Sequence, residues 1–173
     1  ETVALGREYT NFLECFLPQL SAFLKSKGVD KNTYFHVSDE PSREHLEQYG
    51  KIRDVVDRAL CGGYTIIDAL SSFDFYKSGV LKNPIPASDH IKPFIENGVK
   101  PLWTYYCCGQ SQKVGNRFMA MPAYRNRILG VQMYKYGVEG FLHWGYNFYN
   151  SRWSLRHLDP FAVTDADGSF PSG

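Results

Sequence analysis

Hydrophobic and polar residues along the chain alternate between helical and strand-like spacing. Apolar side chains recur every three or four residues from about Thr10 to Lys27, and Gly28 follows, which predicts an amphipathic helix with a glycine stop. Pro18 falls inside this stretch and is expected to kink the helix or split it in two. The short apolar run from Tyr34 to Ser38 then predicts a strand.

Three more helix and strand pairs follow. Ser42 is suited to cap the second helix, which Gly62 and Gly63 end. The remaining segments are expected as a buried strand from Tyr64 to Leu70, an irregular stretch from Ser71 to Ala87, a short helix carrying Ile91, Phe94 and Ile95, a strand from Val99 to Tyr106, a helix opened by Pro122, and a strand from Gly140 to Trp144.

Apolar strands that alternate with amphipathic helices predict an α/β fold with a parallel sheet. The segments after the strands are longer and more polar than the turns before them, which is typical of a (β/α) barrel with its chemistry at the carboxyl ends of the strands. Four strands make half of such a barrel. Since there is no repeat or linker, we expect one domain over residues 1–173, a partial TIM-type barrel.

Composition and charge exclude few functions, but they limit the classes of partner that we expect the chain to bind. The net charge of +1 gives no electrostatic reason to bind nucleic acid or an anionic membrane, and no apolar run is long enough to span a bilayer. No cysteine pair or histidine pair has the spacing of metal ligands, so we expect no metal and no cofactor. The start at Glu1 without Met and the turn-like last residues suggest a piece of a longer protein.

The four cysteines, Cys15, Cys61, Cys107 and Cys108, are expected to be free and mostly buried thiols. Adjacent cysteines such as Cys107 and Cys108 rarely form a disulfide. Free thiols favour a reducing compartment, and hence slightly favour the cytoplasm.

Two adjacent carboxylates follow the first predicted strand, in the sequence Asp39-Glu40-Pro41. An unpaired buried charge is costly, so acids at a strand end indicate that the strand opens into a ligand site. Consecutive strand residues point to opposite faces, so Asp39 and Glu40 share a site only if the chain bends there. Pro41 is expected to hold Glu40 in an extended conformation. The alternative is that both acids interact with the dipole of the next helix.

Aromatic and polar residues mark the ends of the other strands. Aromatic residues make up 16% of the chain, which suits a sugar-binding cleft and equally suits an α/β core. Packing in the core is therefore the alternative for Tyr105 and for several of the candidates for substrate binding, which are Trp103, Asp68, His143, Trp144, Tyr146 and Asn147.

Several segments, taken in order, resemble the catalytic barrel of glycoside hydrolase family 123 and the related domain of unknown function 4091. The resemblance covers almost all of the chain from Thr10 onward. It lies in His36-Val37-Ser38-Asp39-Glu40-Pro41, Leu102-Trp103-Thr104-Tyr105-Tyr106-Cys107-Cys108-Gly109, Arg127-Ile128-Leu129-Gly130, Gly140-Phe141-Leu142-His143-Trp144-Gly145-Tyr146-Asn147, Asp159-Pro160-Phe161 and Phe170-Pro171-Ser172-Gly173.

The resemblance implies hydrolysis of N-acetyl hexosamine β-glycosides with retention, in which the substrate's own acetamido oxygen attacks the anomeric carbon. Glu40 would be the general acid/base, and Asp39 would orient the acetamido group. Tyr105 is the first choice for a hydroxyl that helps to hold that group. The resemblance also implies that the acids end barrel strand four, and that strands one to three and strand eight lie outside the chain.

The absence of an evident carboxylate nucleophile agrees with substrate assistance, because other retaining glycosidases hold a second carboxylate about 5 Å from the acid. Asp68, at the end of the second strand, is the other carboxylate candidate. Three alternatives remain open: a carbohydrate-binding pseudoenzyme or fragment, a hydrolase that uses a metal or another nucleophile and is built on Asp68, His143 and Asp39, and a structural or interaction module. Exposed barrel edges would favour self-association.

Overall fold

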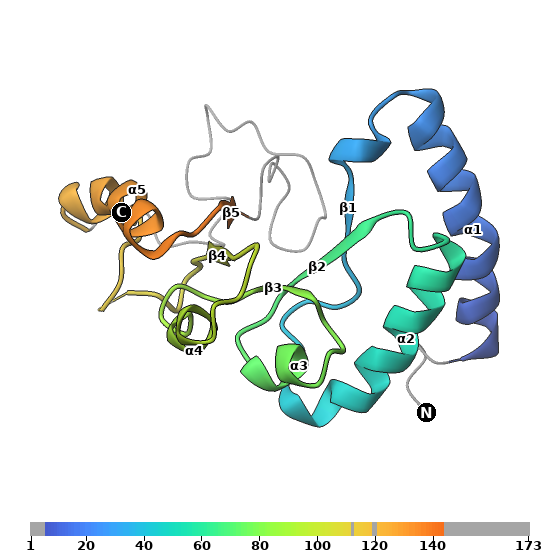
Figure 1. Cartoon of the computed structure of the whole chain (residues 1–173), viewed down its shortest axis with the longest axis horizontal. Helices are drawn as coiled ribbons and strands as arrows, with labels where there is room; N and C mark the ends of the chain where they lie inside the picture. The colour runs from blue at the N-terminus through green and yellow to red at the C-terminus, as the bar shows by residue number, and fades with distance from the viewer. Residues whose placement is uncertain (1–5, 112, 119–120, 144–173) are drawn as a thin grey trace, which may run out of the picture.

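The protein is described by a computed structural model that places residues 6–111, 113–118 and 121–143 (Figure 1). Helices and short strands alternate along it, with 3₁₀ turns at Asp30–Asn32 and Arg43–His45. The elements are α1 (Arg7–Ser26), β1 (Tyr34–Phe35), α2 (Leu46–Ala59), β2 (Thr65–Ala69), α3 (Phe73–Lys77), β3 (Asn83–Ile85), α4 (Lys92–Glu96), β4 (Trp103–Tyr105), α5 (Tyr124–Tyr136) and β5 (Gly140–Leu142).

The strands pair in parallel and follow one another in chain order. β1 pairs with β2, β2 with β3, and β4 with β5. A parallel bridge between Ala87 and Tyr105 joins the two groups, where the Ser88 N–H donates to the Tyr105 carbonyl at 2.8 Å. The predicted α/β class with parallel strands is confirmed, and this strand succession is the one that a (β/α) barrel uses. The extent of the barrel and the single-domain boundary stay predictions.

One strand and one helix were not predicted from the sequence. The stretch from Ser71 to Ala87 was expected to be irregular, yet it contains α3 and β3. Pro84 lies in the middle of β3, and proline disfavours a strand assignment because it has no N–H for the ladder. The pairing survives because the Ile85 carbonyl accepts the Leu70 N–H at 2.9 Å, and the side-chain Nδ2 of Asn83 donates to the Ile66 carbonyl at 3.2 Å.

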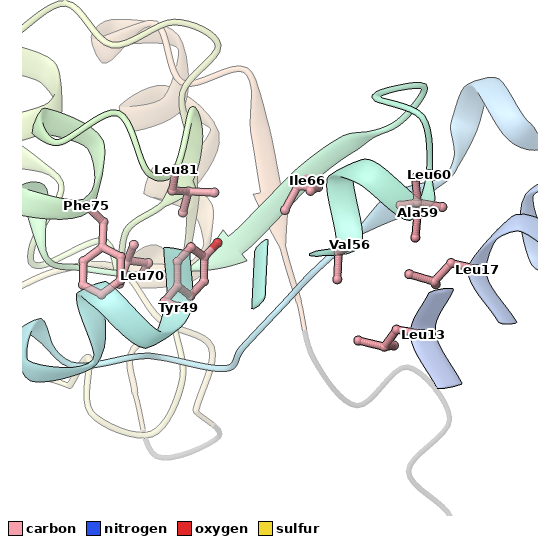
Figure 2. Close-up of a cluster of buried hydrophobic side chains, with 10 residues drawn as sticks. All are labelled: Leu13, Leu17, Tyr49, Val56, Ala59, Leu60, Ile66, Leu70, Phe75 and Leu81. Carbon is pink, nitrogen blue, oxygen red and sulfur yellow. The ribbon is translucent and has the colours of Figure 1, made fainter. Parts of the chain in front are cut away.

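The main core lies between α1, α2 and β2 (Figure 2). Leu13 and Leu17 on α1 are buried in the same cluster as Val56 and Leu60 around α2. Pro18 was expected to kink or split α1, and the helix is not split, since it runs as one element from Arg7 to Ser26. Its two buried leucines precede the exposed proline by one and five residues, so packing on α2 holds the helix together around the missing N–H.

The second predicted helix starts differently from expectation. It opens with the 3₁₀ turn Arg43–His45 before α2, and Ser42 makes no side-chain hydrogen bond to a backbone N–H there. The Ser42 hydroxyl instead donates to Glu44 Oε1 at 3.0 Å and lies 2.8 Å from His45 Nδ1. The serine therefore ties side chains of the turn to one another.

The carboxyl-terminal part of the described chain is less buried. A small cluster of Phe94, Val99 and Leu102 supports α4, whereas α5 contributes no buried residue. The four cysteines are free as predicted, but Cys15, Cys61 and Cys108 are exposed, so the expectation of mostly buried thiols is wrong. Within the described ranges, the helices are too short or too polar to cross a membrane.

Candidate active site

The two adjacent acids lie on a sharp turn after β1. This strand ends at Phe35, three residues earlier than predicted, and Asp39 and Glu40 fall in a bend. Glu40 has a φ of 43°, so the expected extended conformation is wrong. A left-handed conformation costs a non-glycine residue about 1–3 kcal/mol, which the surrounding structure must offset. One contribution is the Glu40 N–H, which donates to the Ala69 carbonyl at 3.1 Å.

Asp68 fixes the backbone that leads into this turn. Its Oδ1 accepts the N–H groups of Val37 at 2.9 Å and Ser38 at 3.1 Å, and its other oxygen accepts the Tyr49 hydroxyl. The Asp68 side chain has no exposed surface, and Tyr49 is buried beside Phe75 on the inner side of α2 (Figure 2). The carboxyl end of β2 thus holds the chain that leaves β1.

Burial dominates the electrostatics of this pair. It raises the pKa of Asp68, against the opposing effect of the hydrogen bonds from Tyr49, Val37 and Ser38. Burial, together with the neighbouring Asp68 carboxylate, also raises the pKa of the Tyr49 phenol. His36 also lies close to this carboxyl group, with its Nδ1 3.7 Å from Asp68 Oδ1 on a mostly exposed side chain.

The predicted catalytic residues Asp39, Glu40 and Tyr105 come together in one cavity of about 250 Å³. Leu142 of β5 and Cys107 complete much of its wall. Both acids are exposed, while Tyr105 is buried and donates its hydroxyl to Glu40 Oε1. Burial, the hydrogen bond to Glu40 and the charges of both acids raise the pKa of the Tyr105 phenol. Tyr105 therefore stays protonated at neutral pH and can orient Glu40.

A second cavity, of about 350 Å³, lies against the same acid. Glu40 and Tyr105 line it together with polar side chains that were not among the sequence candidates, namely Ser42, Ser71, Ser72, His90 and Gln110. The two serines after β2 carry a signal that could have been used, since they directly follow a strand. His90 follows β3, which was not predicted, so the pattern gave no reason to place it at a strand end.

Asp68 borders a third cavity, of about 220 Å³, together with Asp39. Its carboxylate is nonetheless directed to the Val37 and Ser38 amides and to the Tyr49 hydroxyl. The geometry favours a positioning role for Asp68 over the predicted contact with substrate.

The structure does not bring Trp103 to the acids. Trp103 is the first residue of β4 and pairs with Gly140, the first residue of β5, whereas Tyr105 comes at the carboxyl end. Its ring makes an edge contact with Tyr34, at 5.3 Å between centroids. Trp103 is therefore at the amino-terminal edge of the strands, where it packs among neighbours, and its predicted sugar contact has no support from this position.

His143 lies at the end of β5 but on the other face from the acids. Its ring contacts Phe141 and Tyr106, with centroids 6.4 Å and 6.5 Å away. Leu142, between Phe141 and His143 in the chain, is the residue that faces the cavity with Glu40. Alternation along the strand accounts for this separation. The candidates Trp144, Tyr146 and Asn147 lie outside the described residues.

The alternative of a metal-dependent hydrolase requires Asp68, His143 and Asp39 to converge. Within residues 6–111, 113–118 and 121–143, no three His, Cys, Asp or Glu side chains are grouped so as to hold a metal ion. The arrangement instead supplies a Glu40 carboxyl group hydrogen-bonded to a phenol, the Asp39 carboxyl group beside it, and two cavities that Glu40 lines.

Comparison with known proteins identifies a family whose model matches this chain. The family model described as glycoside hydrolase 123, catalytic domain, matches residues 2–173. This match spans nearly the whole chain and includes the turn with both acids. No protein of curated function matches the chain significantly.

Proposed function

Because the chain belongs to the glycoside hydrolase 123 catalytic-domain family, we propose that it hydrolyses N-acetyl hexosamine β-glycosides with retention of configuration. Membership of the family makes it a glycosidase domain that acts on carbohydrate. The proposal adds the sugar, the mechanism and the roles of Asp39, Glu40 and Tyr105.

In the first step, the acetamido oxygen of the bound sugar attacks C1 as the glycosidic bond breaks. Glu40 donates its proton to the departing oxygen, and Asp39 accepts a hydrogen bond from the acetamido N–H and stabilises the positive charge of the cyclic oxazolinium intermediate. In the second step, Glu40 takes a proton from water while the water oxygen attacks C1, and this attack opens the oxazolinium ring. Glu40 is then protonated again, and the sugar leaves with its original anomeric configuration.

The observation that carries the proposal is the shared cavity of Asp39 and Glu40. Adjacent residues of a straight strand would face opposite sides, and the left-handed φ of Glu40 supports their convergence. These are the only carboxylates among the described residues that line this cavity. A site with one acid and one neighbouring carboxylate suits a reaction in which the substrate supplies the nucleophile.

The acetamido group itself provides the test. We expect an aryl 2-acetamido-2-deoxy-β-hexosaminide to be hydrolysed, and its N-trifluoroacetyl analogue to react much more slowly, because fluorine withdraws electrons from the attacking oxygen. The measurement is kcat/KM for both substrates at one pH, with the anomer of the first-formed product identified by NMR.

The outcomes separate the mechanisms. Equal rates for the two analogues would contradict substrate assistance while leaving a glycosidase with Asp39 as nucleophile. Binding of the sugar without any turnover would favour the carbohydrate-binding alternative. An inverted first product would contradict retention.

Self-association was predicted through exposed barrel edges and is a separate proposal. The exposed aromatic side chains along α1 offer a different surface for it, since Tyr9, Phe12, Phe16 and Phe23 are each about half exposed. Sedimentation velocity should show a dimer that Phe12→Glu dissociates, and a monomer at all concentrations would contradict it.

A further inference from the structure

We propose that the 350 Å³ cavity binds the sugar that departs as the leaving group, and that His90 recognises one of its hydroxyls. This inference rests on the proposed function, because it assigns the two sides of the acid to the two halves of a disaccharide. It adds a subsite and a specificity-determining residue to the catalytic roles above.

Glu40 is shared by the two cavities, and Asp39 distinguishes them. Glu40 and Tyr105 line both cavities, whereas Asp39 lines only the smaller one. A general acid must reach the oxygen that joins the two sugars. The two sugars flank this oxygen, so the acid is next to both of their binding sites. Asp39 marks the side of the acetamido sugar. The larger cavity is thus on the side of the departing sugar.

The lining of the larger cavity suits a hydroxylated ring. Ser42, Ser71, Ser72, His90 and Gln110 supply hydroxyl, imidazole and amide groups from four successive strand-to-helix loops. Its volume of about 350 Å³ is near the lower end of the range of about 300–1,000 Å³ for ligand pockets, which matches a small occupant. Groups that bind one ligand from several loops discriminate by hydrogen bonding, so a sugar fits better than a lipid.

His90 is held in a defined orientation. Its Nδ1 lies 2.8 Å from Asp89 Oδ1, and the same carboxylate oxygen accepts Gln110 Nε2 at 3.1 Å. Gln110 is itself fixed, because its Oε1 accepts the Cys107 N–H at 2.7 Å. Asp89 therefore anchors both His90 and Gln110.

The anchoring also sets the tautomer of the neutral imidazole. When Asp89 Oδ1 accepts from both side chains, His90 Nδ1 is the donor, which leaves the lone pair of the neutral ring on Nε2. His90 is mostly exposed, so this acceptor is accessible to a ligand. A sugar hydroxyl that donates to Nε2 would hold the leaving ring while Glu40 protonates its oxygen.

Two substrates with the same N-acetyl hexosamine separate the leaving-group side from the rest of the site. One is a β-linked disaccharide, and the other is the β-glycosyl fluoride, whose leaving group is too small to fill the cavity. We expect His90→Ala to lower the ratio of kcat/KM for disaccharide over fluoride about tenfold, as expected for one lost hydrogen bond. His90→Gln, which keeps an acceptor, should restore part of the ratio.

Lys82→Ala is the matched control, because Lys82 is also exposed and precedes β3 at the opposite edge of the sheet. Its ratio should equal that of the unchanged chain, and circular dichroism verifies the fold of all three variants. An unchanged ratio in His90→Ala, with both substrates hydrolysed, overturns the inference and leaves the proposed function intact. Hydrolysis of neither substrate by the unchanged chain refutes the proposed function, and this inference with it.

Discussion

Two carboxylates at the ends of neighbouring parallel strands meet opposite surroundings. Asp68, in β2, has a fully buried side chain that accepts hydrogen bonds from two backbone amides and a phenol. Glu40, after β1, is exposed, and its oxygen accepts the Tyr105 hydroxyl. The first is committed to the fold, whereas the second keeps an oxygen accessible to a ligand.

The comparison shows that Glu40, after β1, can take part in catalysis because Asp68, in β2, stabilises the backbone before it. Glu40 has an unfavourable backbone conformation, which persists only if the chain around it is held. Asp68 holds Val37 and Ser38, immediately before the acids. Loss of Glu40 should therefore affect activity alone, and loss of Asp68 should affect stability first and activity through it.

The largest effect is expected for Glu40→Gln. Removal of a general acid/base lowers kcat/KM by about 10²–10⁴-fold, while the amide oxygen still accepts the Tyr105 hydroxyl, so the free energy of unfolding should change by less than about 0.5 kcal/mol. Steady-state kinetics on a disaccharide and urea denaturation measure the two quantities. Glu47→Gln, on the exposed side of α2, is the matched control and should alter neither. Comparable losses in both variants would contradict the role of Glu40.

Asp68→Ala should destabilise the fold by about 3 kcal/mol. It leaves the Val37 and Ser38 amides and the Tyr49 hydroxyl without their acceptor, and each unsatisfied buried group costs about 1–3 kcal/mol before relaxation. Urea denaturation measures the loss, and kcat should fall with it. Asp68→Asn keeps an acceptor for the amides and should lose less. A stable, fully active Asp68→Ala would show that the turn does not depend on β2.

Tyr49→Phe should be milder, at about 1–2 kcal/mol, because it removes one of the three donors to Asp68 and preserves the ring that packs on Phe75. Thermal unfolding measures this change. Tyr134→Phe, on the exposed surface of α5, controls for loss of a phenol hydroxyl. If the two variants were equally stable, the hydrogen bond between Tyr49 and Asp68 would make no net contribution to the stability of the fold.

The smallest effect is a dependence of stability on pH. Burial raises the pKa of folded Asp68 above its ordinary value of 3.8, so the folded state binds this proton more tightly than the unfolded chain. That contribution is complete below pH 3.8 and is lost as pH rises through the raised pKa of the folded state. The stability of the unchanged chain relative to Asp68→Asn should therefore decline above this pH and then level off. A relative stability that increased over this interval would contradict the direction of the shift.

The sequence predicted the acids at a strand end because two charges directly after an apolar run rarely belong to a closed core. It also predicted the parallel α/β class, since the alternation of periodicities is strong. It could not reveal the left-handed Glu40, because the residue before a proline ordinarily prefers an extended backbone. The compensating contacts come from Asp68 and Ala69, about thirty residues further on.

Trp103 and β3 show two ways in which a local sequence pattern misleads, since Trp103 was a candidate that lies away from the acids and β3 was a strand that the pattern did not predict. Trp103 was a candidate for substrate binding, but its place at the start of β4 depends on where that strand begins. The proline in β3 concealed a strand whose ladder depends on partners in β2. His90 was missed for the same reason, since its role depends on the strand before it.

The indole of Trp103 has an effect beyond its own neighbourhood. A Cβ atom at Gly140 would lie 2.3 Å from that ring, so a larger residue opposite Trp103 would require the ring to move, and this favours the observed alignment of β4 with β5. A slip by one residue would exchange Phe141 for Leu142 beside Glu40. The Trp103 ring, at the amino-terminal end of the strands, therefore helps to determine that Leu142 lines the cavity at their carboxyl ends.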